Sequence, residues 1–272
     1  MDKVFEQAEL FRHLFTETIQ NLVRESFGKR DLWVREKSQG ERVSELDMVL
    51  NEAIADFFRV HLPGIPLVSE EGFTGVFPDS NFVLCDPLDG THNRLMGLPT
   101  FGLMFVWIQN RRPVSSMVFL PAKQLLSGNG FHFAARGHGA WQHGFGGWER
   151  LHVSDCAALE KARLLIDGPS NVSDRHPFVQ KVKPRVARWR APGACWAGVL
   201  IATGGLLPEG ADFLVSVGSK PWDNLPIALL VEEAGGRVTG LDGNPYDLGN
   251  CSELVFSNGT LHETILEAGS VS

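Results

Sequence analysis

Acidic residues stand beside three separate apolar segments of this sequence. Glu70 and Glu71 follow the run "IPLVS", Asp86 and Asp89 follow the run "NFVLC", and Asp223 precedes the apolar segment "NLPIALLV". Carboxylate oxygens are the ligands that hard divalent cations such as Mg²⁺ prefer, with water or substrate phosphate in the remaining positions. A bound cation would also offset the cost of placing several carboxylates beside buried strands. Together, the three groups predict one divalent metal site.

The segment "DPLDGT", which begins at Asp86, has the composition of a turn that can direct several oxygen atoms at one point. Its proline has a fixed φ and no N–H donor, and Gly90 tolerates a positive φ. The turn can therefore aim the Asp86 and Asp89 carboxylates and the Leu88 carbonyl at a cation. If Thr91 opens a helical turn, its amide and that of Gly90 face the same space and favour a phosphate there.

Each acidic group has a simpler interpretation when it is taken alone. Asp-Pro and Asp-Gly pairs are common in turns, the pair Glu70–Glu71 is typical of a solvated loop, and Asp223 is a good N-cap for the helix predicted after it. Only the joint occurrence of the three groups favours a metal site. A further acidic pair, Glu232–Glu233, is interpreted as the solvated face of a helix.

The elements that would position these residues follow from the hydrophobic pattern. Apolar residues spaced by three and four predict amphipathic helices over residues 4–23 and 47–61. The short apolar runs before Glu70 and Asp86 predict two central strands whose C-terminal ends carry the acids. The chemistry is therefore expected at one end of a sheet.

Strand-like runs dominate the rest of the first half, whereas strands and helices alternate in the second half. The runs "FGLMFVWIQ" and "PVSSMVFLP" predict a hairpin, and "FHFAARGHGAW" continues the strand pattern. Later strands are predicted in "ARLLID", "DFLVSV", "RVTG" and "ELVFS", with helices near residues 176–182, 196–203 and 224–234. Helices packed on sheets in this way predict an α/β protein.

The length of 272 residues allows one large domain or two modest ones. A polar, glycine-rich stretch at residues 143–150 predicts the boundary between two lobes of a single compact catalytic unit. The N-terminal α+β lobe, 1–145, would carry most of the metal ligands. The C-terminal α/β lobe, 146–272, would complete the site.

Composition and charge argue against several functional classes. The chain is 43% hydrophobic and 21% charged, with a net charge of -7 and no basic run, so it lacks the electrostatic footprint of a protein that binds nucleic acid or an anionic membrane. No apolar run reaches the roughly 18 residues of a membrane span, and the charged N-terminus does not resemble a signal peptide. Four widely separated cysteines predict free thiols. We therefore expect a cytoplasmic protein.

Several motifs resemble those of the inositol monophosphatase family of magnesium-dependent, lithium-sensitive phosphatases. "DPLDGTHN" followed by "GLP" resembles the first family signature, and "KPWDNLPIALLVEEAGG" resembles the second. "VSEEG" and "GERVSELD" resemble two earlier elements, and the matches run in the family's order from Glu41 to Asn258. The resemblance implies the layered α-β-α-β-α sandwich of the inositol monophosphatase and fructose-1,6-bisphosphatase type.

The resemblance also implies which residues hold Mg²⁺. The family pattern assigns Glu70, Asp86 and the carbonyl of Leu88 to a first ion. It assigns Asp86, Asp89 and Asp223 to a second ion. Such a pair of ions is typical of enzymes that activate water for in-line displacement at phosphorus.

Further roles are carried over in the same way. Thr91, with Glu70, would orient and deprotonate the attacking water, while the amides of Gly90 and Thr91 hold phosphate oxygens. Asp89 would also contact the substrate. Asp47 is similar to a residue that supports a weaker third metal through water.

A few positions of this chain bear on substrate choice. Ser216 stands where many relatives have a glutamate that binds substrate hydroxyls, and His92 replaces a common threonine. His92 either contacts the substrate or caps a turn. Gly193, Ala194 and Cys195 match the family's substrate-contact element, although Cys195 can equally be a buried thiol.

The resemblance thus implies a Mg²⁺-dependent phosphomonoesterase that acts on a small phosphorylated polyol or sugar and forms a homodimer. One alternative keeps this chemistry but changes the substrate to a nucleotide-type phosphate, histidinol phosphate or a specialised biosynthetic intermediate. Another alternative is a non-catalytic scaffold that binds metal or phosphate. No nucleic-acid or membrane partner is expected.

Overall fold

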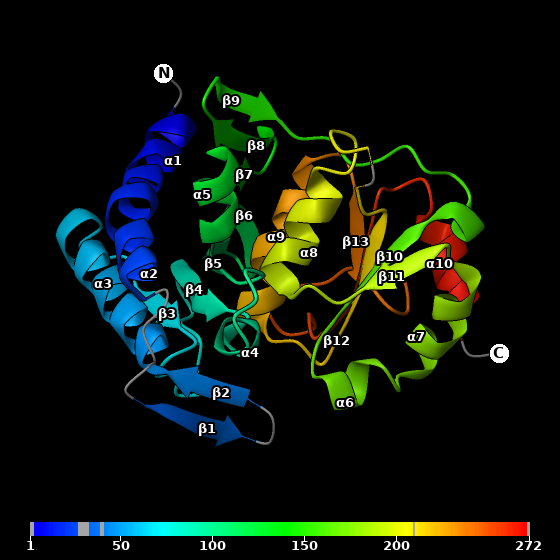
Figure 1. Cartoon of the computed structure of the whole chain (residues 1–272), viewed down its shortest axis with the longest axis horizontal. Coiled ribbons are helices and arrows are strands. Elements are labelled where there is room, and N and C mark those ends of the chain that lie inside the picture. The colour runs from blue at the N-terminus through cyan, green and yellow to red at the C-terminus, as the bar shows by residue number, and fades with distance from the viewer. Residues whose placement is uncertain (1–2, 27–32, 39–40, 209, 271–272) are drawn as a thin grey trace.

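The computed structural model describes residues 3–26, 33–38, 41–208 and 210–270 (Figure 1). Seven strands form one sheet and lie in chain order across it: β3 (Leu67–Ser69), β4 (Phe82–Asp89), β5 (Gly102–Gln109), β6 (Arg112–Phe119), β7 (Phe131–Ala135), β8 (Gly139–Gly144) and β9 (Gly147–Arg150). β3 and β4 are parallel, and the other neighbouring strands of this sheet are antiparallel.

A second sheet has five strands in the order β11 (Arg188–Arg190), β10 (Arg163–Asp167), β12 (Phe213–Val217), β14 (Glu253–Ser257) and β13 (Arg237–Gly240). β10 is parallel to both β11 and β12, whereas β14 is antiparallel to its two neighbours. β1 (Val34–Ser38) and β2 (Glu41–Ser44) form a separate antiparallel hairpin.

Helices cover the outer face of the seven-stranded sheet, as Figure 1 shows on its left side. α1 (Lys3–His13), a π-helical turn (Leu14–Ile19) and α2 (Gln20–Ser26) follow one another without a break, and α3 (Glu45–His61) packs beside them. Their apolar faces bury aromatic side chains against the sheet, as in the stack of Phe15 on Phe119. Each fully buried side chain of this size contributes about 2 kcal/mol. The two predicted amphipathic helices are confirmed.

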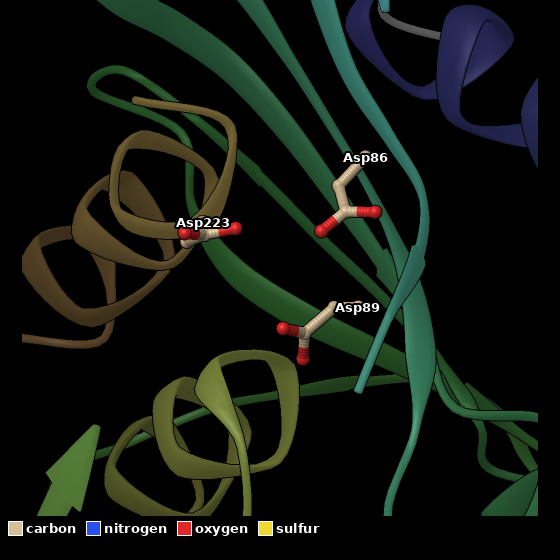
Figure 2. Close-up of side chains that lie close together, drawn as sticks. All are labelled: Asp86, Asp89 and Asp223. Atoms are coloured by element: carbon tan, nitrogen blue, oxygen red, sulfur yellow. The ribbon is translucent and has the colours of Figure 1, made fainter. Parts of the chain in front are cut away.

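Two helices lie between the sheets. α8 (Ala194–Ala202) and α9 (Pro221–Glu233) are apolar nearly all round and are buried against strands of both sheets. A helix without a polar face is stable only where both of its sides are covered. The N-terminal turn of α9, which carries Asp223, lies near the end of β4 (Figure 2).

The remaining helices include a pair on the outer face of the five-stranded sheet. α7 (Pro177–Val182) and α10 (His262–Gly269) pack there with α7 residues Phe178 and Val179 in the core. Short helices α4 (Thr91–Leu95), α5 (Pro121–Ser127) and α6 (Ser170–Ser173) connect strands. Helices and sheets thus alternate in five layers, and the predicted α-β-α-β-α sandwich is confirmed.

Some predictions about individual elements are wrong. β3 does not lie in the centre of its sheet, because it pairs only with β4 among the described strands. The stretch 143–150 contains the end of β8 and all of β9, so the seven-stranded sheet continues past residue 145 to Arg150. The sequence pattern also missed the β1–β2 hairpin, α5 and α10. The division into two lobes stays a prediction.

The interpretation of Glu232–Glu233 as a solvated helix face is wrong, because both side chains bind the seven-stranded sheet. Glu233 accepts hydrogen bonds from the amides of Gly137 and Gly139 at 2.9 Å, and Glu232 pairs with Arg136 at 3.1 Å. These contacts fasten the β7–β8 turn to the C-terminal end of α9. The pair therefore joins the middle helix layer to the seven-stranded sheet.

None of the helices in the described part of the chain combines the length and the apolar composition that crossing a bilayer requires.

Candidate metal centre

An irregularity in β4 brings two acids to the same face of the sheet. Asp86 pairs with Met104 of β5, and Asp89 pairs with Gly102, so three steps along β4 match two steps along β5. In a regular strand, residues three apart point to opposite faces. The extra residue acts like a β-bulge and turns Asp89 to the side of Asp86, towards the middle helices.

The backbone around this irregularity holds Asp86 in place. Its Oδ1 accepts a hydrogen bond from the amide of Leu88 at 2.9 Å, across the intervening proline. Gly102, opposite Asp89, has no room for a side chain, because an added Cβ would lie 2.6 Å from the carbonyl oxygen of Phe119 and 3.0 Å from Cys195 Sγ. Glycine at 102 therefore allows α8 to approach β5 closely.

The third acid of the centre comes from the first turn of α9. Pro221 occupies the first helical position, where its missing N–H costs nothing. Asp223 Oδ2 accepts a hydrogen bond from the amide of Lys220 at 2.7 Å. Asp223 is therefore not the N-cap itself but a carboxylate inside the first turn, where the helix dipole stabilises negative charge.

The three carboxylates converge on one space between the end of β4 and the start of α9 (Figure 2). Asp86, Asp89 and Asp223 each offer a ligand oxygen, and these oxygens all lie within 4.8 Å of one another. All three donors are hard oxygen ligands, which suit Mg²⁺, Ca²⁺ or Mn²⁺ better than softer metals.

Burial and mutual repulsion make this cluster costly without a cation. Burial, followed by the charges of Glu70, Asp89 and Asp223, raises the pKa of Asp86 well above its usual range. Burial and then the charge of Asp89 raise the pKa of Asp223 in the same way. The pKa of Asp89 rises to about 7, first through burial and then through the charge of Asp167. A divalent ion would reverse the repulsion that raises these pKa values.

Glu70, the predicted ligand of the first ion, is not one of the three converging carboxylates, although its charge acts on them. It is half-buried just after β3, and its amide donates to the carbonyl of Cys85 at 2.9 Å, which fixes it against the strand that carries Asp86. Its charge acts on Asp86, Asp89 and Asp223. Its assignment to the first ion stays a prediction.

The predicted helical turn at Thr91 is present. Gly90 has a φ of +83° and precedes α4, and a Cβ at this position would lie 2.8 Å from the carbonyl oxygen of Thr100. The Thr91 hydroxyl donates to Asp47 Oδ1 at 2.7 Å, with the Leu88 carbonyl at 3.1 Å as its other acceptor. The Leu88 carbonyl, a predicted metal ligand, therefore lies beside the Thr91 side chain.

Asp47 is held by the start of α3. The N-cap Ser44 gives Asp47 Oδ2 two hydrogen bonds, from its amide at 2.8 Å and from its hydroxyl at 2.6 Å. This is a capping box, in which the N-cap and the third helical residue satisfy each other. The sequence motif "SELD" thus fixes a buried carboxylate that points Oδ1 at Thr91. Its predicted support of a third metal stays a prediction.

The substrate-contact element borders the centre at the N-terminus of α8. The amide of Cys195 donates to Asp89 Oδ2 at 2.8 Å, and the space that a side chain at Gly193 would take lies 3.6 Å from the same oxygen. The Cys195 side chain is fully buried, and burial raises its thiol pKa well above the usual value. Ala194 is also buried. Cys195 therefore meets the metal centre through its amide.

The two residues after Thr91 differ in role, because His92 is exposed to solvent and Asn93 binds the backbone. His92 is exposed, so it is free to meet a ligand from the open side. Asn93 has a structural role, because its side-chain amide donates to the carbonyls of Thr100 at 2.9 Å and Pro192 at 3.1 Å. Asn93 thereby fastens the segment after β4 to the loop that leads into α8.

Ser216 does not offer its hydroxyl to open space. It is fully buried in β12, where its Oγ lies 2.9 Å from Ser219 Oγ and 2.8 Å from Asn224 Oδ1. The acid beside Ser216 in the five-stranded sheet is Asp167, the last residue of β10. Sequence reasoning missed this residue. The signal was available, since "ARLLID" is another apolar run that ends in an acid.

Comparisons with known proteins agree on one family. The profile of the Inositol monophosphatase family matches residues 8–270. The chain is 29% identical to a fructose-1,6-bisphosphatase/inositol-1-monophosphatase of Thermotoga maritima, over 83% of this chain and 81% of that protein. It is 31% identical to a histidinol-phosphatase of Mycobacterium tuberculosis, over 90% of this chain and 91% of that protein.

A solved structure supports the same conclusion. The inositol monophosphatase TM1415 of Thermotoga maritima superposes with a TM-score of 0.80 at 27% identity, over 98% of this chain and 96% of that one. The layered fold, the acidic cluster and the match over nearly the whole chain point the same way. The chain belongs to the inositol monophosphatase family of phosphoric monoester hydrolases.

Proposed function

We propose that this protein is a Mg²⁺-dependent phosphomonoesterase that hydrolyses a small phosphorylated polyol, sugar or related alcohol by two-metal activation of water. The observation that carries the proposal is the convergence of Asp86, Asp89 and Asp223, whose ligand oxygens lie within 4.8 Å of one another. The fold holds two carboxylates from β4 and one from α9 close together, although their burial and mutual repulsion cost stability. A bound cation would offset this cost.

The donor set fits Mg²⁺. Glu70, Asp86 and the Leu88 carbonyl would hold one ion, and Asp86, Asp89 and Asp223 would hold the other. Four carboxylates would then balance the charge of two divalent ions. When bound, such ions polarise the phosphate oxygens and the attacking water and stabilise the leaving oxygen.

The chain itself supplies the group that positions the attacking water. The Thr91 hydroxyl donates a hydrogen bond to Asp47 Oδ1 at 2.7 Å, so the lone pairs of Thr91 Oγ1 are available to accept a hydrogen bond from a water molecule. Ser44 fixes Asp47 through two hydrogen bonds, so the direction of this proton is set before substrate arrives. Glu70, beside the cluster, is the second acceptor.

The backbone around Thr91 would hold the phosphate. The positive φ of Gly90 turns the amides of Gly90 and Thr91 out of β4 and into the start of α4. The amide of Cys195 already reaches Asp89 from the opposite side. A phosphate at this point would thus be bound by backbone donors as well as by the cations.

A second candidate substrate is histidinol phosphate. The name of the Mycobacterium tuberculosis relative, which is 31% identical, favours it, whereas the Thermotoga maritima relative, at 29%, favours inositol and fructose phosphates. Both candidates share the phosphomonoester and differ in the alcohol that leaves.

Phosphate release tests the proposal directly. We expect the purified protein to release inorganic phosphate from p-nitrophenyl phosphate in the presence of Mg²⁺ and to lose this activity with EDTA. A panel of inositol 1-phosphate, fructose 1,6-bisphosphate, a nucleotide monophosphate and histidinol phosphate would then rank the substrates. Hydrolysis that EDTA leaves intact would contradict two-metal catalysis, and binding of Mg²⁺ without any hydrolysis would identify a scaffold.

Replacing Thr91 tests the proposed proton path. We expect Thr91→Val to lower kcat by about 100-fold, because the acceptor oxygen is lost while the side-chain shape is kept. Thr91→Ser, which keeps the oxygen, is the matched control and should retain most of the activity. Equal kcat values for the two variants would contradict a role for the hydroxyl.

A homodimer is part of the proposal. Leu98 and Trp189 line a pocket of about 420 Å³ beside the edge strand β11, and Leu98 is 45% and Trp189 42% exposed. Met96, close by in the chain, is 56% exposed. Exposed apolar side chains in and near this pocket support an interface between two copies.

A further inference from the structure

The wall of the metal centre formed by the five-stranded sheet carries one carboxylate that the two ions do not need. Asp167 ends β10, and its register partner in the parallel strand β12 is Ser216. Register partners in neighbouring strands point to the same face of a sheet. Ser216 faces α9, because its hydroxyl lies 2.8 Å from Asn224 of that helix. Asp167 therefore also faces the middle layer, from which Asp223 comes.

The core supports this orientation. Leu165 and Leu214 belong to the cluster between the two sheets, whereas Ile166 and Val215 belong to the cluster under the outer helices. Side chains alternate along a strand, so Asp167 shares the inner face with Leu165. Its charge also acts on Asp89 and Asp223.

A short chain of hydroxyl groups sets the position of the Asp167 carboxylate. Ser219, in the loop before α9, donates to Asp167 Oδ2 at 2.9 Å. Ser219 Oγ in turn lies 2.9 Å from Ser216 Oγ, whose other neighbour is Asn224. The amide nitrogen of Asn224 is fixed by the carbonyl of Cys251 at 2.8 Å. Ser216 and Ser219 thus act on Asp167 as positioning residues.

Charge decides what this carboxylate would accept. The four acids Glu70, Asp86, Asp89 and Asp223 balance two divalent ions, and Asp47 is bound by the hydroxyls of Ser44 and Thr91. The phosphate dianion and Asp167 remain as the negative charges that face the alcohol part of the substrate. A neutral alcohol would leave this charge unpaired in a half-buried wall. An ammonium group on the alcohol would pair with it in a charge-assisted hydrogen bond.

We propose that Asp167 is the specificity-determining residue that binds the alcohol part of the substrate, and that it selects an alcohol carrying an ammonium group over the same alcohol without one. This inference rests on the proposed phosphatase function and extends it to the substrate class. The residue that binds the alcohol part of the substrate is then on β10, and Ser216 of β12 helps to position it through Ser219.

A cycle of two enzymes and two substrates tests the inference. The probes are histidinol phosphate and its deamino analogue, which has the same imidazole and phosphate but no ammonium group. We expect the wild-type protein to prefer histidinol phosphate by about 10- to 100-fold in kcat/KM, the range of a charge-assisted hydrogen bond. Asp167→Asn should reduce this preference to about 3-fold or less, mainly through a higher KM for histidinol phosphate. Asp242→Asn, at an exposed turn after β13, is the matched control and should keep the wild-type preference.

Two further measurements keep the outcomes distinct. If Asp167→Asn does not fold, inhibition of wild-type p-nitrophenyl phosphate hydrolysis by histidinol and by deamino-histidinol gives the same comparison, with histidinol expected to inhibit at least about tenfold more strongly. Failure to hydrolyse p-nitrophenyl phosphate with Mg²⁺ would overturn the proposed function. Hydrolysis of that compound without any preference for the ammonium-bearing alcohol, or a preference that survives Asp167→Asn, would overturn the role of Asp167 alone.

Discussion

Asp86→Asn should abolish Mg²⁺-dependent phosphate release, with a loss on the order of 1,000-fold, and should not destabilise the metal-free protein. Asp86 is 2% exposed and is the ligand that the two proposed ions share. Asparagine has the same shape and still offers Oδ1 to the amide of Leu88, so the turn after β4 stays closed. The charge that holds the cations is lost.

The effect on stability has the opposite sign to the effect on activity. The charges of Glu70, Asp89 and Asp223 oppose ionisation of Asp86 in the folded protein. Removing one charge from the cluster relieves this repulsion, so the melting temperature in EDTA should stay equal or rise. Addition of Mg²⁺ should then raise the melting temperature of the wild type but scarcely that of the variant. Retained hydrolysis, or a fall of about 5 °C or more in EDTA, would contradict the assignment.

Thermal melts and phosphate release measured on the same preparations would separate these two effects. Asp242→Asn again serves as the control, because it removes one exposed carboxylate outside the cluster. Its activity and its response to Mg²⁺ should match those of the wild type.

The convergence of Asp86, Asp89 and Asp223 was predictable from the sequence, but the way in which the fold brings them together was not. The sequence shows Asp86 and Asp89 three residues apart, a spacing that would point them to opposite faces of a regular strand. The irregular register against β5, where Asp89 pairs with Gly102, solves this problem. Nothing local to the motif indicates that register.

Long-range partners limit what local patterns can tell. Thr91 and Asp47 are 44 positions apart, and their hydrogen bond needs both the capping box of α3 and the turn after β4. The capping pattern "SELD" was visible, but the sequence could not identify Thr91 as the donor to the second carboxylate oxygen of Asp47. In the same way, Ser216 was predicted to stand where many relatives have a glutamate that binds substrate hydroxyls, whereas the acid on this sheet is Asp167 on the adjacent strand.

Elements were predicted well where the hydrophobic pattern repeats over many residues. The helices over 4–23 and 47–61 have several turns of regular spacing, and both are present. The strands β8 and β9 were not predicted separately, because their glycines and polar side chains lack a regular hydrophobic alternation, although they continue the sheet to Arg150. Short, polar strands are recognised through their backbone partners, which only the folded chain supplies.

The acidic cluster should also make the effect of Mg²⁺ on stability increase with pH. The pKa of Asp89 rises to about 7 in the metal-free fold, and the pKa values of Asp86 and Asp223 are raised as well. Unfolded aspartates titrate near about pH 4, so between about pH 4 and 7 the folded protein binds more protons than the unfolded chain. The contribution of these groups to the free energy of unfolding therefore falls as pH rises, by about 1.4 kcal/mol for each pKa unit.

Buried histidines make the free energy of unfolding rise with pH, and this contribution must be separated from that of the carboxylates. Burial lowers the pKa of His262 to about 4 and lowers that of His132 as well. These groups stay neutral in the fold, so their contribution to stability rises with pH up to the unfolded value near about 6.5. The total curve in EDTA mixes both effects, whereas the difference between Mg²⁺ and EDTA isolates the carboxylates that the cation contacts.

We therefore expect the gain in melting temperature from Mg²⁺ to be small at about pH 5 and to grow to several degrees by about pH 8, because the ions bind the deprotonated cluster. Ca²⁺ should give a similar stabilisation, since its ligand preferences are also for oxygen. In Asp86→Asn the gain should be small at every pH, which ties the effect to this cluster. A gain for the wild type that is constant between about pH 5 and 8 would show that protons and cations do not compete at the cluster, and would contradict its role as the metal centre.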